Sequence, residues 1–176
     1  MKIFAFMIVS LLGFSSYVEA GVLDVRVASG TVQGVTADGI SRFLGIPYAA
    51  APIGNLRWAS PQPVRPWKGV RKAAEFGPAC IQAIMPDGFG PWTTEYVAQE
   101  PTSEDCLSLN IWAPAVHQDK KIPVLVWIHG GAFMAGANSV PVYDGEALAR
   151  QGIIVVSINY RLGAFGFAAF EELKGA

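Results

Sequence analysis

Two continuous apolar runs, both rich in Val and Ile, constrain the fold of this chain more than any other feature. They are VLVWI at 124–128 and IIVVSI at 153–158. Runs of this kind are typical of strands buried on both faces, as in a parallel sheet that helices cover. Between them, 144–151 is predicted as a short helix that ends at Gly152. The succession of strand, helix and strand predicts an α/β fold.

The residues before these runs predict a different arrangement. Residues 22–28 alternate apolar and polar side chains, which predicts a strand with one face in water, and 31–35 could pair back with it. A third short strand is expected over 40–46, so the fold should begin with a small antiparallel sheet. From 47 to 101 nine prolines interrupt a long loop, and regular structure resumes at 107–112. A loop of this length needs a functional or covalent reason.

The first 20 residues have the pattern of a secretory signal peptide. Lys2 gives a short positive region, 3–12 is apolar but too short to span a bilayer, and small residues at Val18 and Ala20 predict cleavage before Gly21. The alternatives are an uncleaved anchor and a buried N-terminal helix. On this interpretation the protein is exported, to the periplasm or the medium, and 21–176 is one incomplete domain with no membrane span.

Cys80 and Cys106 are the only cysteines of the chain. In an exported protein an even count favours a disulfide, and the alternative is two buried free thiols. A bridge would close a loop of the 25 residues 81–105 and would stabilise the fold by about 3 kcal/mol in the loop-entropy treatment. The formal net charge is −1 and no basic run occurs, which argues against nucleic acid as a partner.

The sequence His-Gly-Gly-Ala at 129–132 follows the first apolar run directly. α/β sheets bind their ligands at the carboxyl ends of the strands. There the backbone N–H groups of Gly130, Gly131 and Ala132 could stabilise an oxyanion, as the glycine-rich turn of lipases and esterases does. The alternative is a plain tight turn. His129 lies on the turn itself, so we expect it to brace the loop by hydrogen bonds and not to act as a catalytic base.

Five collinear blocks of the chain resemble the type-B carboxylesterases, relatives of the cholinesterases within the α/β-hydrolase fold. The blocks are FLGIPYAAAPIGNLRW at 43–58, PQPVRPWKGVRKAAEFGPAC at 61–80, SEDCLSLNIWAP at 103–114, PVLVWIHGGAFMAG at 123–136 and IVVSINYRLGAFGF at 154–167. They cover nearly all of 21–176 and are similar to the N-terminal portion of that family. The resemblance implies the small antiparallel sheet followed by the start of a central, mostly parallel sheet.

The resemblance also implies roles for individual residues. Gly131 and Ala132 match the two oxyanion donors, with Gly130 in support, and Cys80 and Cys106 match the first disulfide of the family. The remaining matches are structural or line the site: an ion pair of Arg57 with Glu104, a supporting block of Asn159, Tyr160 and Arg161, and Phe133, which lines either the acyl pocket or the core.

Three positions depart from the family pattern. Ser108 stands where Tyr or Thr is usual, and Ala132 replaces a third glycine but keeps the backbone N–H. Trp92 lies between the two cysteines, but its offset from Cys80 does not match the choline-binding tryptophan of cholinesterases. A quaternary ammonium substrate is therefore not implied.

The serine on which this chemistry depends is not found in the 176 residues. No Gly-x-Ser-x-Gly motif occurs, since Ser29, Ser139 and Ser157 lack the flanking glycines. We therefore expect a serine carboxylesterase acting on a small ester of an alcohol or phenol, whose nucleophile, acid and histidine lie outside this chain. The chain alone should be inactive, and no cofactor or metal is implied. An inactive binding protein and a truncated product remain as alternatives, and the sequence does not predict the oligomeric state.

Overall fold

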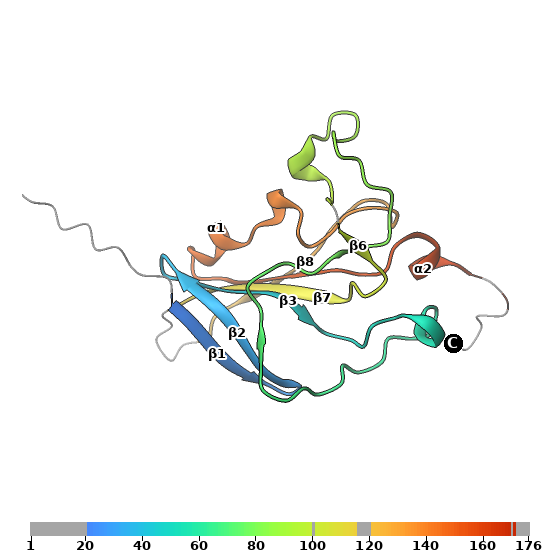
Figure 1. The fold of residues 1–176 in the computed structure, drawn as a ribbon. Helices are drawn as coiled ribbons and strands as arrows, with labels where there is room; N and C mark the ends of the chain where they lie inside the picture. Colours follow the sequence, from blue (N-terminus) through green and yellow to red (C-terminus); the bar gives the residue numbers. More distant parts are fainter. Residues whose placement is uncertain (1–20, 100, 116–120, 170, 172–176) are drawn as a thin grey trace, which may run out of the picture.

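The structure, a computed structural model, describes residues 21–99, 101–115, 121–169 and 171. The predicted signal peptide at 1–20 lies outside the described residues. Figure 1 shows one twisted sheet with short helices and long connections around it. In chain order the elements are β1 (Gly21–Val27), β2 (Gly30–Ala37), β3 (Ile40–Pro47), the 3-10 helix η1 (Gly54–Leu56), β4 (Val70–Lys72), β5 (Ala79–Cys80), η2 (Thr94–Tyr96), β6 (Thr102–Ser103), β7 (Ser108–Pro114), β8 (Val124–Ile128), η3 (Pro141–Tyr143), α1 (Glu146–Ala149), β9 (Ile154–Ile158) and α2 (Gly163–Phe167).

The predicted N-terminal strands and the central strands form a single sheet. The order is β1-β2-β3-β7-β9-β8, with β4 beside β2. The pairs from β1 through to β9 are antiparallel, and β8 pairs in parallel with β9. The antiparallel start is therefore continuous with the central sheet, and within the described residues the path has one parallel pair. The two apolar runs are the neighbours β8 and β9, as expected of a strand, helix and strand unit.

The predicted burial of VLVWI on both faces is wrong for the described part of the chain. Val124, Val126 and Ile128 are 58%, 56% and 60% exposed. Within the described residues β8 is the last strand in the sheet order and its one sheet partner is β9, and the faces that carry these side chains are left uncovered. In β9, by contrast, Val155 and Ser157 are buried.

The other edge of the sheet differs from its prediction in the same way. Every residue of β1 is exposed, including Val22, Leu23 and Val25, so the strand has two wet faces and not one. The buried core lies further inside, between β3, β7, β9 and α1. Its members include Ile40, Phe43, Trp112, Ala149 and Val155.

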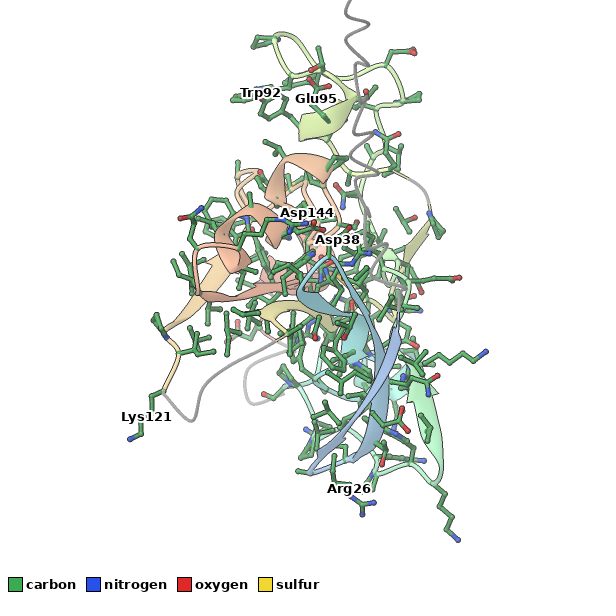
Figure 2. The ribbon with its side chains drawn as sticks, turned by 90° about the vertical axis from the view of Figure 1, so that its left-hand side faces the viewer. Arg26, Asp38, Trp92, Glu95, Lys121 and Asp144 are labelled. Atoms are coloured by element: carbon green, nitrogen blue, oxygen red, sulfur yellow. A yellow bond between two sulfur atoms is a disulfide. The ribbon has the colours of Figure 1, made fainter. Side chains whose placement is uncertain are left out.

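The connection from 47 to 101 is largely irregular, as the prolines predict, with only short elements in it. Its second half projects from the sheet as a separate lobe at the top of Figure 1. The small sheet of β5 and β6 lies at the base of this lobe. In Figure 2 the labelled Trp92 and Glu95 lie in the lobe, and Asp144 lies nearer the sheet.

Candidate functional site

The base of the lobe is closed covalently. Cys80 and Cys106 form a disulfide with their Cα atoms 5.0 Å apart, which confirms the predicted bridge. Both residues are buried, at 2% and 1% exposed, and pack with Ala49, Leu107 and Leu162. The bridge therefore ties the start of the lobe to the strand β7 that begins two residues after Cys106.

The predicted ion pair lies beside this disulfide. Arg57 Nε and Nη2 donate to the two carboxylate oxygens of Glu104 at 2.6 and 2.7 Å. The hydrogen bonds from Arg57 lower the pKa of Glu104, and those to Glu104 raise the pKa of Arg57. The guanidinium carbon also lies 5.7 Å from the ring centroid of Trp58 and 5.9 Å from that of Phe165. This bidentate ion pair joins the segment that contains Arg57 and Trp58 to the loop closed by the disulfide.

The His-Gly-Gly-Ala stretch continues into a tightly wound turn after β8. Gly131 has a φ of 116°, and Ala132 and Phe133 follow it at 52° and 62°, in the left-handed region. The carbonyl oxygen of Gly131 accepts from the N–H groups of Met134 and Ala135 at 3.0 and 3.1 Å. A Cβ at Gly131 would lie 2.0 Å from the Ala135 oxygen, so this glycine is required. At Gly130 a Cβ would meet nothing within 4 Å.

The donors that the sequence analysis singles out are free of partners in the described part of the chain. The N–H groups of Gly131 and Ala132 donate to no acceptor there, and neither does that of Gly130. All three residues line a cavity of about 490 Å³. A pair of neighbouring backbone donors without internal acceptors, beside a cavity, can stabilise a negatively charged oxygen of a ligand.

His129, at the start of the turn, is buried and contacts the backbone of the turn. It is 3% exposed, its Nδ1 lies 2.9 Å from the Gly130 oxygen, and its ring stacks on Tyr160 with centroids 4.5 Å apart. Because a carbonyl oxygen only accepts, the proton of the neutral ring must be on Nδ1. Burial lowers the pKa of His129, and the hydrogen bond to Gly130 opposes that shift. This arrangement agrees with the expected bracing role.

The block that follows β9 contacts the turn and the N-terminal segments. Tyr160 donates its hydroxyl to the His129 oxygen at 2.9 Å. Asn159 accepts from the N–H of Asn138 at 2.7 Å and donates to the Pro78 oxygen at 3.1 Å. Arg161 donates to the carbonyl oxygens of Arg57 and Ala59, both at 3.0 Å. The three predicted supporting residues thus hold three different segments together.

Phe133 is not a core residue in the described structure. It is 60% exposed, and its ring lies 4.6 Å from that of Phe167. It lines a second hollow of about 420 Å³ together with His129, Tyr160 and Phe167. Of the two interpretations of Phe133, lining a pocket is the one that its exposure favours.

For two residues of the site, Asn110 and Gln82, the sequence predicted no role. Asn110, in the middle of β7, donates to the Asn138 oxygen at 3.1 Å and to Ser157 Oγ at 3.2 Å, and so anchors the segment after the turn. A buried amide inside an apolar strand is a signal that could have found it. Gln82 pairs with Gly136 across 54 positions of sequence. No local pattern marks this glutamine.

The cavity beside the turn has an uncharged lining that includes four aromatic side chains. The disulfide-closed loop contributes Gln82, Ala83, Met85, Phe89, Trp92, Tyr96, Val97 and Ala98, and the remainder comes from Gly130, Gly131, Ala132, Ala135, Gly136 and Tyr143. The Trp92 and Tyr96 rings are in contact, with centroids 5.5 Å apart. The described residues contain no group of three or more His, Cys, Asp or Glu side chains that could hold a metal ion. No helix among them is long and apolar enough to cross a membrane.

Comparison with known proteins identifies what this arrangement resembles. The model of the carboxylesterase family matches residues 22–175. Curated relatives include fumonisin B1 esterase of Sphingopyxis macrogoltabida, 46% identical over 83% of this chain, and acetylcholinesterase of Bungarus fasciatus, 47% identical over 85%. Para-nitrobenzyl esterase of Bacillus subtilis (strain 168) is 45% identical over 86% of the chain. The chain spans 25% to 30% of the length of these three relatives.

Solved structures agree with the sequence matches. A PNB esterase superimposes with a TM-score of 0.73 at 41% identity, covering 85% of this chain and 29% of its own. A thermophilic PNB esterase gives a TM-score of 0.75 at 42% identity, covering 85% of this chain and 30% of its own. These likenesses confirm the predicted fold class.

Proposed function

The chain belongs to the carboxylesterase family, and on that premise we propose that the protein hydrolyses carboxylic esters of small molecules through a serine nucleophile. One observation carries the proposal: the N–H groups of Gly131 and Ala132 have no acceptor in the described chain and lie beside a cavity of about 490 Å³. That volume is within the usual range for small-molecule sites, about 300–1,000 Å³.

In the proposed reaction a serine hydroxyl attacks the ester carbonyl carbon while a histidine removes its proton. The carbonyl oxygen becomes negative, and the N–H groups of Gly131 and Ala132 donate to it. The alcohol then leaves with a proton from the histidine, and water releases the acid by the same steps in reverse. His129 is unsuited to be that base, because it is 3% exposed and its ring is stacked on Tyr160.

We place the serine outside these 176 residues, because no Gly-x-Ser-x-Gly motif occurs in them. We place the acid and the catalytic histidine outside them as well, because in α/β-hydrolases both follow the serine in chain order. The 176 residues would then supply the oxyanion donors and one wall of the cavity, and should not hydrolyse esters alone. The uncharged lining favours a neutral ester, with an alcohol or phenol group that packs against Trp92 and Tyr96.

The test begins with the gene. Its sequence beyond the codon for Ala176 should encode a Gly-x-Ser-x-Gly motif, and the protein expressed from the complete reading frame should hydrolyse p-nitrophenyl acetate and butyrate. Replacement of the motif serine by alanine should abolish that activity. A complete reading frame without such a motif, or a wild-type protein without ester hydrolysis, would refute the function and favour a binding protein.

We further propose that the protein is exported and that the signal peptide is removed after Ala20. The buried disulfide supports export, because such bridges persist in oxidising compartments. N-terminal sequencing of the protein recovered from the periplasm or the medium should begin at Gly21. Recovery from the cytoplasm with Met1 intact would contradict this proposal.

A further inference from the structure

One side chain of the disulfide-closed loop is bonded directly to the glycine turn. Gln82 Nε2 donates to the Gly136 oxygen at 2.8 Å, and the N–H of Gly136 donates to Gln82 Oε1 at 2.8 Å. The same Nε2 also donates to the Cys80 oxygen at 3.0 Å. The Gln82 amide thus satisfies both backbone groups of Gly136 and joins them to the disulfide cysteine.

This pairing needs an amide. Gly136 presents a donor and an acceptor together, and the planar carboxamide of Gln82 offers the complementary acceptor and donor on one side chain. An ionised carboxylate of the same length could accept from the Gly136 N–H but would place an oxygen against the Gly136 oxygen. The hydrocarbon side chains could do neither.

Gly136 in turn sets the position of the turn. It has a φ of 112°, and a Cβ there would lie 2.4 Å from His129 Nδ1 and 2.6 Å from the Gly130 oxygen. Gly136 is therefore packed directly against the residues that begin the turn. Displacement of Gly136 would move Gly130 and the donors of Gly131 and Ala132 with it.

We propose that Gln82 is a positioning residue for the oxyanion donors: through its paired hydrogen bonds to Gly136 it fixes the Gly131 and Ala132 N–H groups relative to the aromatic wall of the cavity. This inference rests on the proposed ester hydrolysis. Gln82 itself lines the cavity, so its hydrogen bonds fix the glycine turn relative to the loop that forms the rest of the cavity wall. Reaction rates depend on such positioning, since a misplacement of about 1 Å can cost about 10²-fold in rate.

The two hydrogen bonds between Gln82 and Gly136 are called the Gln82 clamp below. The first experiment tests whether this clamp holds the turn, without reference to activity. Amide hydrogen exchange of the 129–138 region should be about 2- to 10-fold faster in Gln82→Ala than in the wild type, at Gly136 and at Met134 and Ala135. Exchange in β7 and β9 should be unchanged. Unchanged exchange at all three amides would overturn the proposal.

The second experiment measures the positioning role in the protein with its complete reading frame. In Gln82→Ala the kcat for p-nitrophenyl butyrate should fall about 10- to 100-fold with little change in KM, less than the loss of about 10²–10³ expected when a donor is removed outright. The affinity for a trifluoromethyl ketone, which forms a tetrahedral adduct, should fall by the same factor as kcat/KM. An unchanged kcat with a raised KM would overturn the positioning role.

A pH signature separates this role from general destabilisation. In Gln82→Glu the ratio of kcat to the wild-type kcat should be low at pH 8 and should rise as the pH falls and the introduced carboxyl gains a proton, because the protonated acid can donate to the Gly136 oxygen. Gln99→Glu is the matched control, since Gln99 is exposed in the same loop and, among the described residues, its amide donates to the Val97 oxygen and not to the glycine turn. A flat ratio, or the same ratio in the control, would overturn the proposal.

A wild-type protein that hydrolyses no ester would refute the proposed function and with it the positioning role. The exchange experiment would still decide whether the clamp itself exists. The two failures are therefore distinguishable.

Discussion

Replacement of Gly131 by alanine should damage the turn, whereas the same replacement at Gly130 should not. The two glycines are adjacent in sequence and both line the cavity. They differ in backbone geometry, because Gly131 has a φ of 116° and Gly130 has no positive φ. They differ in space as well, because a Cβ meets the Ala135 oxygen at 2.0 Å in one case and nothing within 4 Å in the other.

The magnitude follows from these two differences. A residue with a side chain at a φ near 116° costs about 1–3 kcal/mol in backbone strain. The clash is with backbone atoms of Ala135, which cannot rotate away, and overpacking of this kind costs about 1–3 kcal/mol more. Gly131→Ala should therefore lower the free energy of unfolding by at least about 2 kcal/mol, or Tm by at least about 4 °C for a chain of this size.

Urea denaturation and thermal melts of the two variants beside the wild type provide the assay. Gly130→Ala should stay within about 0.5 kcal/mol of the wild type, as surface substitutions without special geometry do. In the active protein Gly131→Ala should also lower kcat, because the strained turn displaces its own N–H and that of Ala132. Equal stability of the two variants would refute the reasoning, since the predicted difference rests on the positive φ of Gly131 and on its close approach to Ala135.

Three other predictions follow from the same structure. Replacement of Cys80 and Cys106 together by serine should lower the free energy of unfolding by about 3 kcal/mol, measured by urea denaturation against the oxidised wild type. Arg57→Ala should lower Tm, and the stabilisation by Glu104, whose pKa is lowered in the fold, should be complete above its ordinary pKa of 4.5 and be lost as the pH falls further. A Tm difference between wild type and Glu104→Gln that persists at strongly acidic pH would contradict this assignment. Because burial lowers the pKa of His129, the folded state should lose stability as the pH falls below 6.5, and His129→Asn should remove that part of the pH dependence of Tm.

The sequence predicted the strands of the sheet because their side-chain patterns are local. The bounds of 124–128 match β8 and those of 153–158 match β9 to within one residue. Burial could not be predicted in the same way, because it depends on what packs against a strand. VLVWI has the composition of a core strand, yet Val124 and Val126 are exposed, since β8 lies at the end of the sheet order.

The candidate site could be predicted where the type of a residue restricts its structural role. Two cysteines in a chain that begins with the pattern of a signal peptide predicted the bridge, and a Gly-Gly sequence after an apolar strand predicted exposed backbone donors. The Gln82 clamp was not predictable, because its partner lies 54 positions away and a glutamine in a loop is usually solvated. The cavity escaped prediction for the same reason, as one wall comes from the disulfide-closed loop and the floor from the turn.

The conformation of the turn is itself an argument about its purpose. Gly131, Ala132 and Phe133 all have positive φ, and two of them carry side chains for which that conformation costs about 1–2 kcal/mol each. Such strain persists only where the surroundings impose it. Here two other segments do so. In the segment after β9, Tyr160 stacks on His129 and the N–H of Gly163 donates to the Phe133 oxygen at 2.8 Å, and in the disulfide-closed loop Gln82 holds Gly136. A turn that merely reversed the chain would need none of these restraints, whereas the proposed role, donors that are oriented before a ligand arrives, accounts for them.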